Sequence, residues 1–186
     1  MRSAVIVIDL QVGLFEVPGK PYAYANTIET INRLTAAARR NRLPVVFVQH
    51  EQVDGVLQYN SPGWALVPEL AVGSSDHMVR KTTPNSFLRT RLQALLDQEK
   101  VDSIIVAGYA TEYCVDSTVR GAAALGYEVQ LVADGHTTHD KEHAAADCIR
   151  THHNITLSNI TSFGVPIQAI TASEIIAQLD QAGQVG

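Results

Sequence analysis

The chain has 186 residues, of which 46% are hydrophobic and 18% are charged, and its formal net charge at pH 7 is −5. This length suits one domain with a full hydrophobic core, and the composition argues against intrinsic disorder. The acidic balance argues against nucleic acid or an anionic membrane surface as a partner, and no apolar run is long enough to cross a bilayer. We therefore expect a single domain, residues 1–186, that acts on a small molecule in the cytoplasm.

Strand-like and helix-like segments alternate along the whole chain, as judged by apolar periodicity, caps and breakers. The first half is expected to contain a strand at 4–8, a helix at 27–41 capped by Asn26, a strand at 45–49, a long loop at 50–76 and a strand at 77–80. The second half is expected to contain a helix after residue 85 with Leu88 facing inward, a strand at 104–107, a helix at 111–126, a strand at 128–133, a helix at 141–152, strands at 155–160 and, less clearly, 165–170, and a helix at 173–179.

Repeated strand-then-helix units predict an α/β fold with three layers, α/β/α. A mainly parallel, Rossmann-like, doubly wound sheet of five to six strands would form the middle layer. In such sheets a ligand binds beyond the carboxyl ends of the strands, where the strand order reverses. Asp9 follows the first strand, and Cys114 comes just after the fourth. If the strand order is 3-2-1-4-5, these two residues are expected to meet.

Cys114 lies between a buried strand and the following helix, where Thr111 is a candidate N-cap. The first turn of a helix has unpaired N–H groups and a dipole that favours negative charge, so we expect a lowered thiol pKa and a nucleophilic thiolate. The alternative interpretation is a small buried hydrophobic residue, which is what most free cysteines are. Cys148 is interpreted in that way, as a packed thiol.

Lys81 follows the third strand and should reach the same edge of the sheet. A carboxylate, an ammonium and a thiol on one edge suit nucleophilic catalysis. Asp9 would accept the thiol proton, and Lys81 would stabilise developing negative charge. Each residue also has an ordinary interpretation, which is a turn aspartate for Asp9 and a solvated lysine for Lys81.

Three segments, taken in chain order, resemble the isochorismatase-like cysteine hydrolases: Val-Ile-Asp-Leu-Gln at 7–11, Lys-Thr-x-x-Asn-Ser-Phe at 81–87 and Gly-Tyr-Ala-Thr-Glu-Tyr-Cys-Val at 108–115. The resemblance extends from about Ser3 to Ile170. It implies a triad of Asp9 as general base, Lys81 as electrostatic partner and Cys114 as nucleophile. It also implies an oxyanion hole from the backbone N–H groups of Ala110 and Cys114, a cis peptide bond before Ala110, and a homo-oligomer, either dimer or tetramer.

The resemblance leaves several activities open. We expect hydrolysis of a small amide or related acyl C–N bond through a Cys114 thioester. Nicotinamidases carry an Asp-x-His pair and a further histidine after the second strand that hold a metal, and residues 47–54 lack this pattern. We therefore expect no metal and no cofactor, with nicotinamidase as one alternative. A vinyl ether hydrolase of the isochorismatase type and a non-catalytic, redox-sensing thiol protein are the others.

Candidate substrate-binding residues are less specific. His50 ends the second strand and is the polar residue placed most readily near a substrate, whereas the aromatic candidates could equally belong to the core or to a subunit interface. These aromatic candidates are Phe15, Trp64 and Tyr113. A second group of histidines has spacings that could suit a metal, but the polar segment favours a solvated loop and helix start. This group comprises His136, His139 and His143.

Overall fold

The computed structural model describes residues 2–16 and 19–183. Its centre is a sheet of six parallel strands in the order β3-β2-β1-β4-β5-β6, so the predicted α/β class is confirmed, and the order on which the meeting of Asp9 and Cys114 depends is the one found. The strands are β1 (Ser3–Ile8), β2 (Val45–His50), β3 (His77–Lys81), β4 (Ser103–Tyr109), β5 (Glu128–Thr137) and β6 (Ile167–Ile170). The helices are α1 (Tyr24–Arg40), α2 (Leu92–Gln98), α3 (Asp116–Ala124), α4 (Ala146–Ser158) and α5 (Ala172–Gly183).

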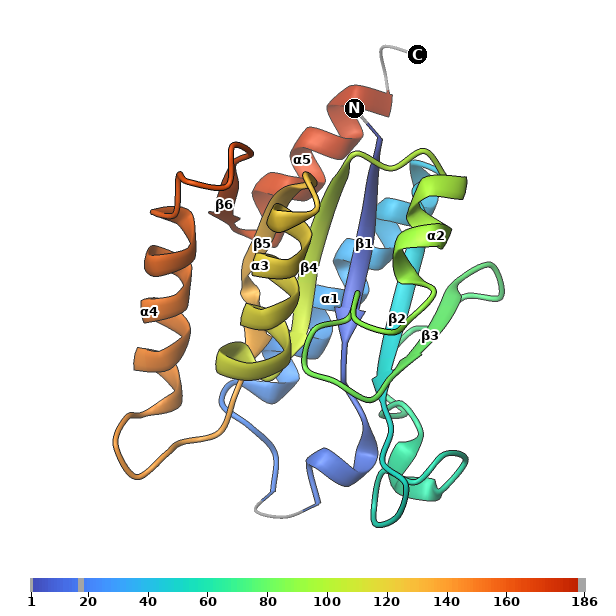
Figure 1. The fold of residues 1–186 in the computed structure, drawn as a ribbon, viewed down its shortest axis with the longest axis vertical. Coiled ribbons are helices and arrows are strands. Elements are labelled where there is room, and N and C mark those ends of the chain that lie inside the picture. Colours follow the sequence, from blue (N-terminus) through green and yellow to red (C-terminus); the bar gives the residue numbers. More distant parts are fainter. Residues whose placement is uncertain (1, 17–18, 184–186) are drawn as a thin grey trace.

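Helices cover both faces of the sheet (Figure 1). One buried cluster joins one face of β1, β2 and β4 to α2, α3 and α4, and a second joins the opposite face to α1 and α5. The central strands are therefore apolar on both sides, and for this reason their sequences are continuous branched runs rather than alternating ones. This arrangement leaves the carboxyl ends of the strands as the place where polar side chains gather.

Three local predictions are wrong. Residues 155–158 belong to α4, since the buried Ile149 and Leu157 are eight positions apart in one helix, while Ile155 is 57% exposed. The β-branched residues there suggested a strand because short apolar runs do not distinguish the two structures. Asn26 lies inside α1 and caps nothing, because that helix begins at Tyr24. Leu88 is 49% exposed and precedes α2.

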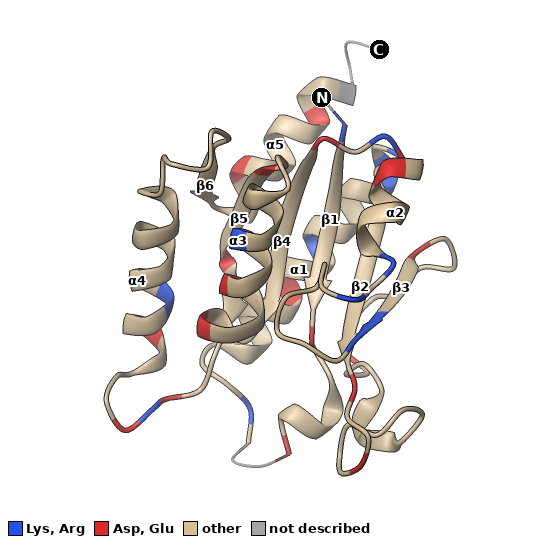
Figure 2. Ribbon diagram, viewed as in Figure 1, with Lys and Arg blue, Asp and Glu red and all other residues tan. Residues whose placement is uncertain are grey.

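Charged residues of both signs are interspersed over helices and loops, and the central strands carry few of them (Figure 2). No helix in the described part of the chain is long and apolar enough to cross a membrane.

Two backbone features shape the edge where β1 and β4 end. Asp9 has a φ of 51°, a left-handed conformation that aspartate tolerates better than most residues, and it turns the chain at the end of β1. Gly108 has a φ of 125° and lies against Ile8 of the neighbouring strand. A Cβ at Gly108 would collide with the backbone of Ile8. Glycine is therefore required where the two strands approach the site.

This requirement predicts an unequal cost for two glycine substitutions. Gly108→Ala should lower the free energy of unfolding by about 3 kcal/mol or more, because both the positive φ and the collision penalise a side chain. Gly126→Ala is the matched control, since Gly126 has a φ of 91° but open space around it. It should cost only about 1 kcal/mol. Urea unfolding of both variants measures the difference, and equal costs would contradict the close approach.

Candidate active site

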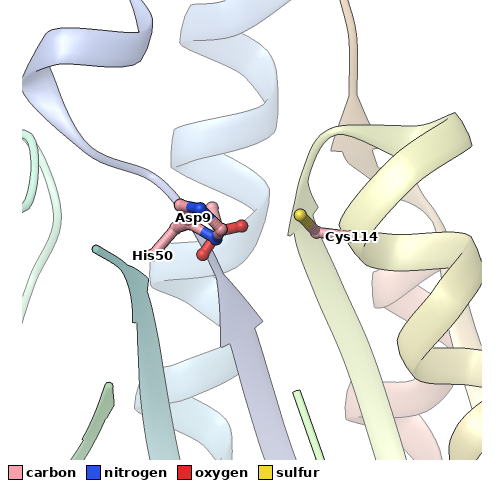
Figure 3. A group of neighbouring side chains, drawn as sticks. All are labelled: Asp9, His50 and Cys114. Carbon is pink, nitrogen blue, oxygen red and sulfur yellow. The ribbon is translucent and has the colours of Figure 1, made fainter. Parts of the chain in front are cut away.

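Four polar side chains meet at the carboxyl edge of the sheet. Asp9 follows β1, and His50 ends β2. Lys81 ends β3, and Cys114 lies in a π-helical turn, Thr111–Val115, between β4 and α3. Figure 3 shows Asp9 and His50 side by side, with the Cys114 sulfur facing them; one carboxylate oxygen, one ring nitrogen and the sulfur lie within 4.8 Å of one another. The sheet order thus brings together residues from four separate parts of the sequence.

The ammonium of Lys81 is the centre of this group. Its Nζ lies 2.6 Å from Oδ2 of Asp9, 3.1 Å from Nδ1 of His50 and 3.2 Å from Sγ of Cys114. An ammonium has three protons, and here each proton has one acceptor. Lys81 is therefore fully paired although its side chain is buried.

The ion pair between Lys81 and Asp9 is shielded from solvent, with side-chain exposures of 0% and 2%. Removing one partner of such a pair is costly, because it leaves an uncompensated buried charge. The second carboxylate oxygen of Asp9, Oδ1, is buried and has no hydrogen-bond partner among the described residues. This oxygen is therefore free to accept a proton, and the Cys114 thiol is close to the carboxylate.

The pKa of Cys114 differs from the expectation. Burial, together with the negative charge of Asp9, raises the pKa of the Cys114 thiol to about 12, and the nearby Lys81 ammonium offsets only part of this shift. The prediction of a lowered pKa is wrong because it considered the helix terminus and neither the burial of the thiol nor the charge of Asp9. One cation in a buried site balances one anion, and the carboxylate is already that anion.

His50 is held in one orientation and one protonation state. Its Nδ1 accepts from the Lys81 ammonium, so the ring is neutral and its proton is on Nε2. Burial and the positive charge of Lys81 lower the pKa of His50 accordingly. The buried amide of Gln11 clamps the His50 backbone, donating from Nε2 to the carbonyl (2.9 Å) and accepting from the N–H at Oε1 (2.8 Å). Sequence reasoning missed this role of Gln11, although its place as the last residue of the motif at 7–11 was a signal.

A cavity of about 290 Å³ opens over Cys114. Two predicted binding residues, His50 and Tyr113, line it, and so does Ala110. The cavity's other walls come from residues that the sequence did not single out, and two of these lie in the long loop after β2. These additional lining residues are Leu14, Gln52, Leu57 and Tyr109.

Two predicted substrate residues lie elsewhere. Phe15 is buried beneath Tyr109, with ring centroids 5.1 Å apart, and it supports the wall of the cavity without lining it. Trp64 lines a separate cavity of about 540 Å³ beside the edge strand β3. Its backbone carbonyl accepts hydrogen bonds from Gln11 and Gln49, which tie the loop to the ends of β1 and β2.

The turn that carries Cys114 begins differently from the prediction. Ala110 is the residue before the turn and its backbone is extended, so Thr111 does not cap the helix. The Thr111 hydroxyl instead hydrogen-bonds Nδ1 of His136, at 2.8 Å. The peptide bond between Tyr109 and Ala110 is cis, as the resemblance predicts.

The second group of histidines does not form a cluster. His136 is fully buried in β5, so the expectation of a solvated loop is wrong for this residue. Nδ1 of His139 is hydrogen-bonded to the hydroxyl of Tyr109, at 2.9 Å. His143 is exposed.

The group Asp9, His50 and Cys114 has the residue types of a metal site. However, the Lys81 ammonium already contacts one donor atom of each, at 2.6, 3.1 and 3.2 Å. A metal ion between these atoms would take the position of the ammonium and be repelled by it. The residues therefore fit a metal only if Lys81 moves away.

Comparison with known proteins decides the family. A family model described as the isochorismatase domain matches residues 3–161. The chain belongs to the isochorismatase family. This is the family that the three motifs predicted.

Two relatives and one solved structure illustrate the range of the family. A streptothricin hydrolase from Streptomyces noursei is 34% identical over 139 residues, 74% of this chain but only 50% of that protein, so the match spans half of its length. Nicotinamidase 3 of Arabidopsis thaliana is 30% identical over 155 residues, 75% of each chain. A cysteine hydrolase from Pseudomonas syringae pv. phaseolicola 1448A shares the fold, with a TM-score of 0.89, 24% identity and coverage of 97% of this chain and 93% of that one.

The charge balance predicts an inverse effect of Asp9→Asn on thiol reactivity. Removing the carboxylate leaves the Lys81 ammonium without its anion, so the Cys114 thiolate becomes the favoured counter-charge and the pKa of the thiol falls. Alkylation of Cys114 by iodoacetamide at about pH 8 should become about tenfold faster or more than in the unmodified chain. Cys148 is exposed, so its interpretation as a packed thiol is wrong. It serves as the internal control, since its rate should not change. A slower or unchanged rate at Cys114 would contradict the argument that Lys81 balances only one anion in the site.

Proposed function

We propose that this protein hydrolyses small, uncharged amides or related acyl compounds through a thioester on Cys114. The observation that carries this proposal is the buried carboxylate of Asp9, which lies close to the Cys114 thiol and has one oxygen held by Lys81 and the other without a partner among the described residues. A thiol with a raised pKa needs a base at the moment of attack, and Asp9 is positioned to be that base.

The proposed reaction has two halves. Asp9 accepts the thiol proton as Sγ attacks the carbonyl carbon, and the backbone N–H groups of Ala110 and Cys114, both at the cavity wall, stabilise the oxyanion. Asp9 then gives this proton to the leaving amine as the C–N bond breaks. Water attacks the thioester after losing a proton to Asp9, and that proton returns to the sulfur as the acid product leaves. Lys81 remains an ammonium throughout and stabilises the carboxylate and the transient sulfur anion.

The cavity lining supports an uncharged substrate. Among the described residues that line it, there is no arginine and no lysine, and the nearby Lys81 is already paired. Its hydrophobic walls suit a small apolar body, while the Nε2–H of His50 and the amide of Gln52 are available to orient a polar group. We assign His50 and Tyr113 to substrate contact, and Phe15 and Trp64 to support of the cavity and its loop.

The same features weigh against the alternatives. An anionic diene of the kind that isochorismatases cleave would bring negative charge into a site whose single cation is already neutralised. A redox sensor needs an exposed, low-pKa thiol, whereas Cys114 is partly buried and its pKa is raised. The Asp-x-His pair and further histidine with which nicotinamidases hold their metal are absent from residues 47–54.

A covalent intermediate is the first prediction of this mechanism. Acid quench during turnover of a good substrate should add the acyl mass to the tryptic peptide 101–120, which contains Cys114. Asp9→Asn should lower turnover by a factor on the order of 10² or more, and Cys114→Ser should be nearly inactive. Because the triad acts as a unit, Asp9→Asn with Cys114→Ala should be little worse than the worse single variant. Near-normal turnover by Cys114→Ala would refute the thioester and favour ether-type chemistry driven by Asp9.

Discrimination between charged and uncharged substrates is the second prediction of this proposal. In pairs of amides matched in size, such as succinamide and succinamate, the uncharged member should be hydrolysed with a kcat/KM at least about tenfold higher. The matched control is the same pair assayed at high salt, which should change the ratio little if the discrimination arises inside a buried cavity. Preference for the anion would contradict the assignment of an uncharged substrate.

A further inference from the structure

His136 lies behind the candidate active site and does not line its cavity. Its ring is completely buried near the end of β5, and both nitrogens are hydrogen-bonded. Nδ1 meets the hydroxyl of Thr111 at 2.8 Å, and Nε2 meets Oδ1 of Asn154 on α4 at 2.8 Å. The ring therefore connects three elements: β5, α4 and the turn that carries Cys114.

The hydrogen bond between Asn154 and Ala133 determines which atom donates in each of the contacts of His136. The amide of Asn154 donates from Nδ2 to the carbonyl of Ala133, at 3.1 Å, so its oxygen is the atom that faces His136. That oxygen can only accept, and hence Nε2 of His136 carries the proton. Nδ1 is then a bare acceptor, and the hydroxyl of Thr111 donates to it. One tautomer satisfies all of these groups.

The anchored residue, Thr111, occupies a sensitive position. It follows Ala110 directly and is the first residue of the π-helical turn in which Cys114 is the fourth. Single π-helical turns of this kind often occur at functional sites. A shift of Thr111 would move both the backbone N–H groups proposed as the oxyanion hole and the sulfur, because Ala110 directly precedes Thr111 and Cys114 lies in the same turn.

The surroundings of His136 keep it neutral. Burial lowers its pKa to about 4, against a smaller opposing effect of the hydrogen bond with Asn154. Arg150 and His153 on α4 lower the pKa further, and Asp134 on β5 raises it. The tautomer that Thr111 requires therefore persists at neutral pH.

We propose that His136 is a positioning residue: with its tautomer set by Asn154, it anchors Thr111 and thereby aligns Ala110 and Cys114 for acyl transfer. This inference rests on the proposed thioester function, and it adds residues that never touch the substrate.

The test measures acylation of Cys114 by p-nitrophenyl acetate, in which sulfur attacks the ester carbonyl, p-nitrophenolate leaves and the thiol proton passes to Asp9. All variants are made in a Cys148→Ala parent, and the rate of its Cys114→Ala derivative is subtracted as background. Thr111→Val keeps the shape but removes the donor, and acylation should fall about tenfold or more.

Two further variants serve as controls. Thr111→Ser, which keeps the hydroxyl, should retain most of the rate of the parent. Thr27→Val is the matched control, because the buried Thr27 hydroxyl has no partner among the described residues.

A second variant tests the tautomer of His136 through the pH dependence of acylation, which a purely structural role of His136 would not change. Asn154→Asp places a carboxylate on Nε2 and raises the pKa of His136 toward neutrality. Once protonated, Nδ1 becomes a donor and Thr111 loses its acceptor, so acylation relative to the parent should fall up to about tenfold per pH unit below the new pKa. Asn32→Asp is the control, since Asn32 likewise donates from Nδ2 to a carbonyl, that of Glu69, and accepts at Oδ1 from a backbone N–H. Its ratio to the parent should not vary with pH.

The outcomes separate the two proposals. A parent protein that is not acylated on Cys114 contradicts the proposed function and this inference with it. If the parent is acylated, then a Thr111→Val rate equal to the parent, or an Asn154→Asp ratio that is constant with pH, overturns the positioning role alone. If Thr111→Val proves too unstable to assay, the pH profile of Asn154→Asp decides.

Discussion

The buried ammonium of Lys81 is the interaction on which the rest of the site depends. A charge without solvent is tolerated only when its hydrogen bonds are complete and an opposite charge is close. Lys81 meets both conditions through Asp9, His50 and Cys114, with contacts of 2.6 to 3.2 Å. These acceptors follow β1, end β2 and lie in the turn after β4. The charge balance of the site therefore depends on the pairing of the central strands.

A single cation permits a single anion, and this sets the chemistry that the site can perform. Burial and the nearby Asp9 carboxylate raise the pKa of Cys114, so the resting sulfur is a thiol. Our proposal follows from that resting state, in which the proton moves to Asp9 only as a carbonyl carbon is attacked. The same balance argues for an uncharged substrate, since a further anion would have no counter-charge.

Residues outside the cavity hold those inside it. The amide of Gln11 makes two hydrogen bonds to the His50 backbone, and Phe15 packs beneath Tyr109. Buried hydrogen bonds of this kind are strong because water does not compete for them, and they restrict each group to one geometry. Reactive geometry in this fold thus depends on contacts well behind the reacting atoms.

The sequence by itself determined the fold class and the family, because apolar runs and strand-end motifs are local and periodic signals, whereas the order of the central strands entered only as a condition. It also located Asp9, Lys81 and Cys114 at strand ends, which parallel topology gathers on one edge. Only the tertiary structure decided what depends on distant partners. The raised pKa of Cys114 requires the burial of the thiol and the nearby charge of Asp9, and the hydrogen bonds of the buried His136 require a hydroxyl and an amide from two other elements. Hydrogen bonding and desolvation depend on neighbours in space, so they cannot be predicted from the spacing of residues along the chain.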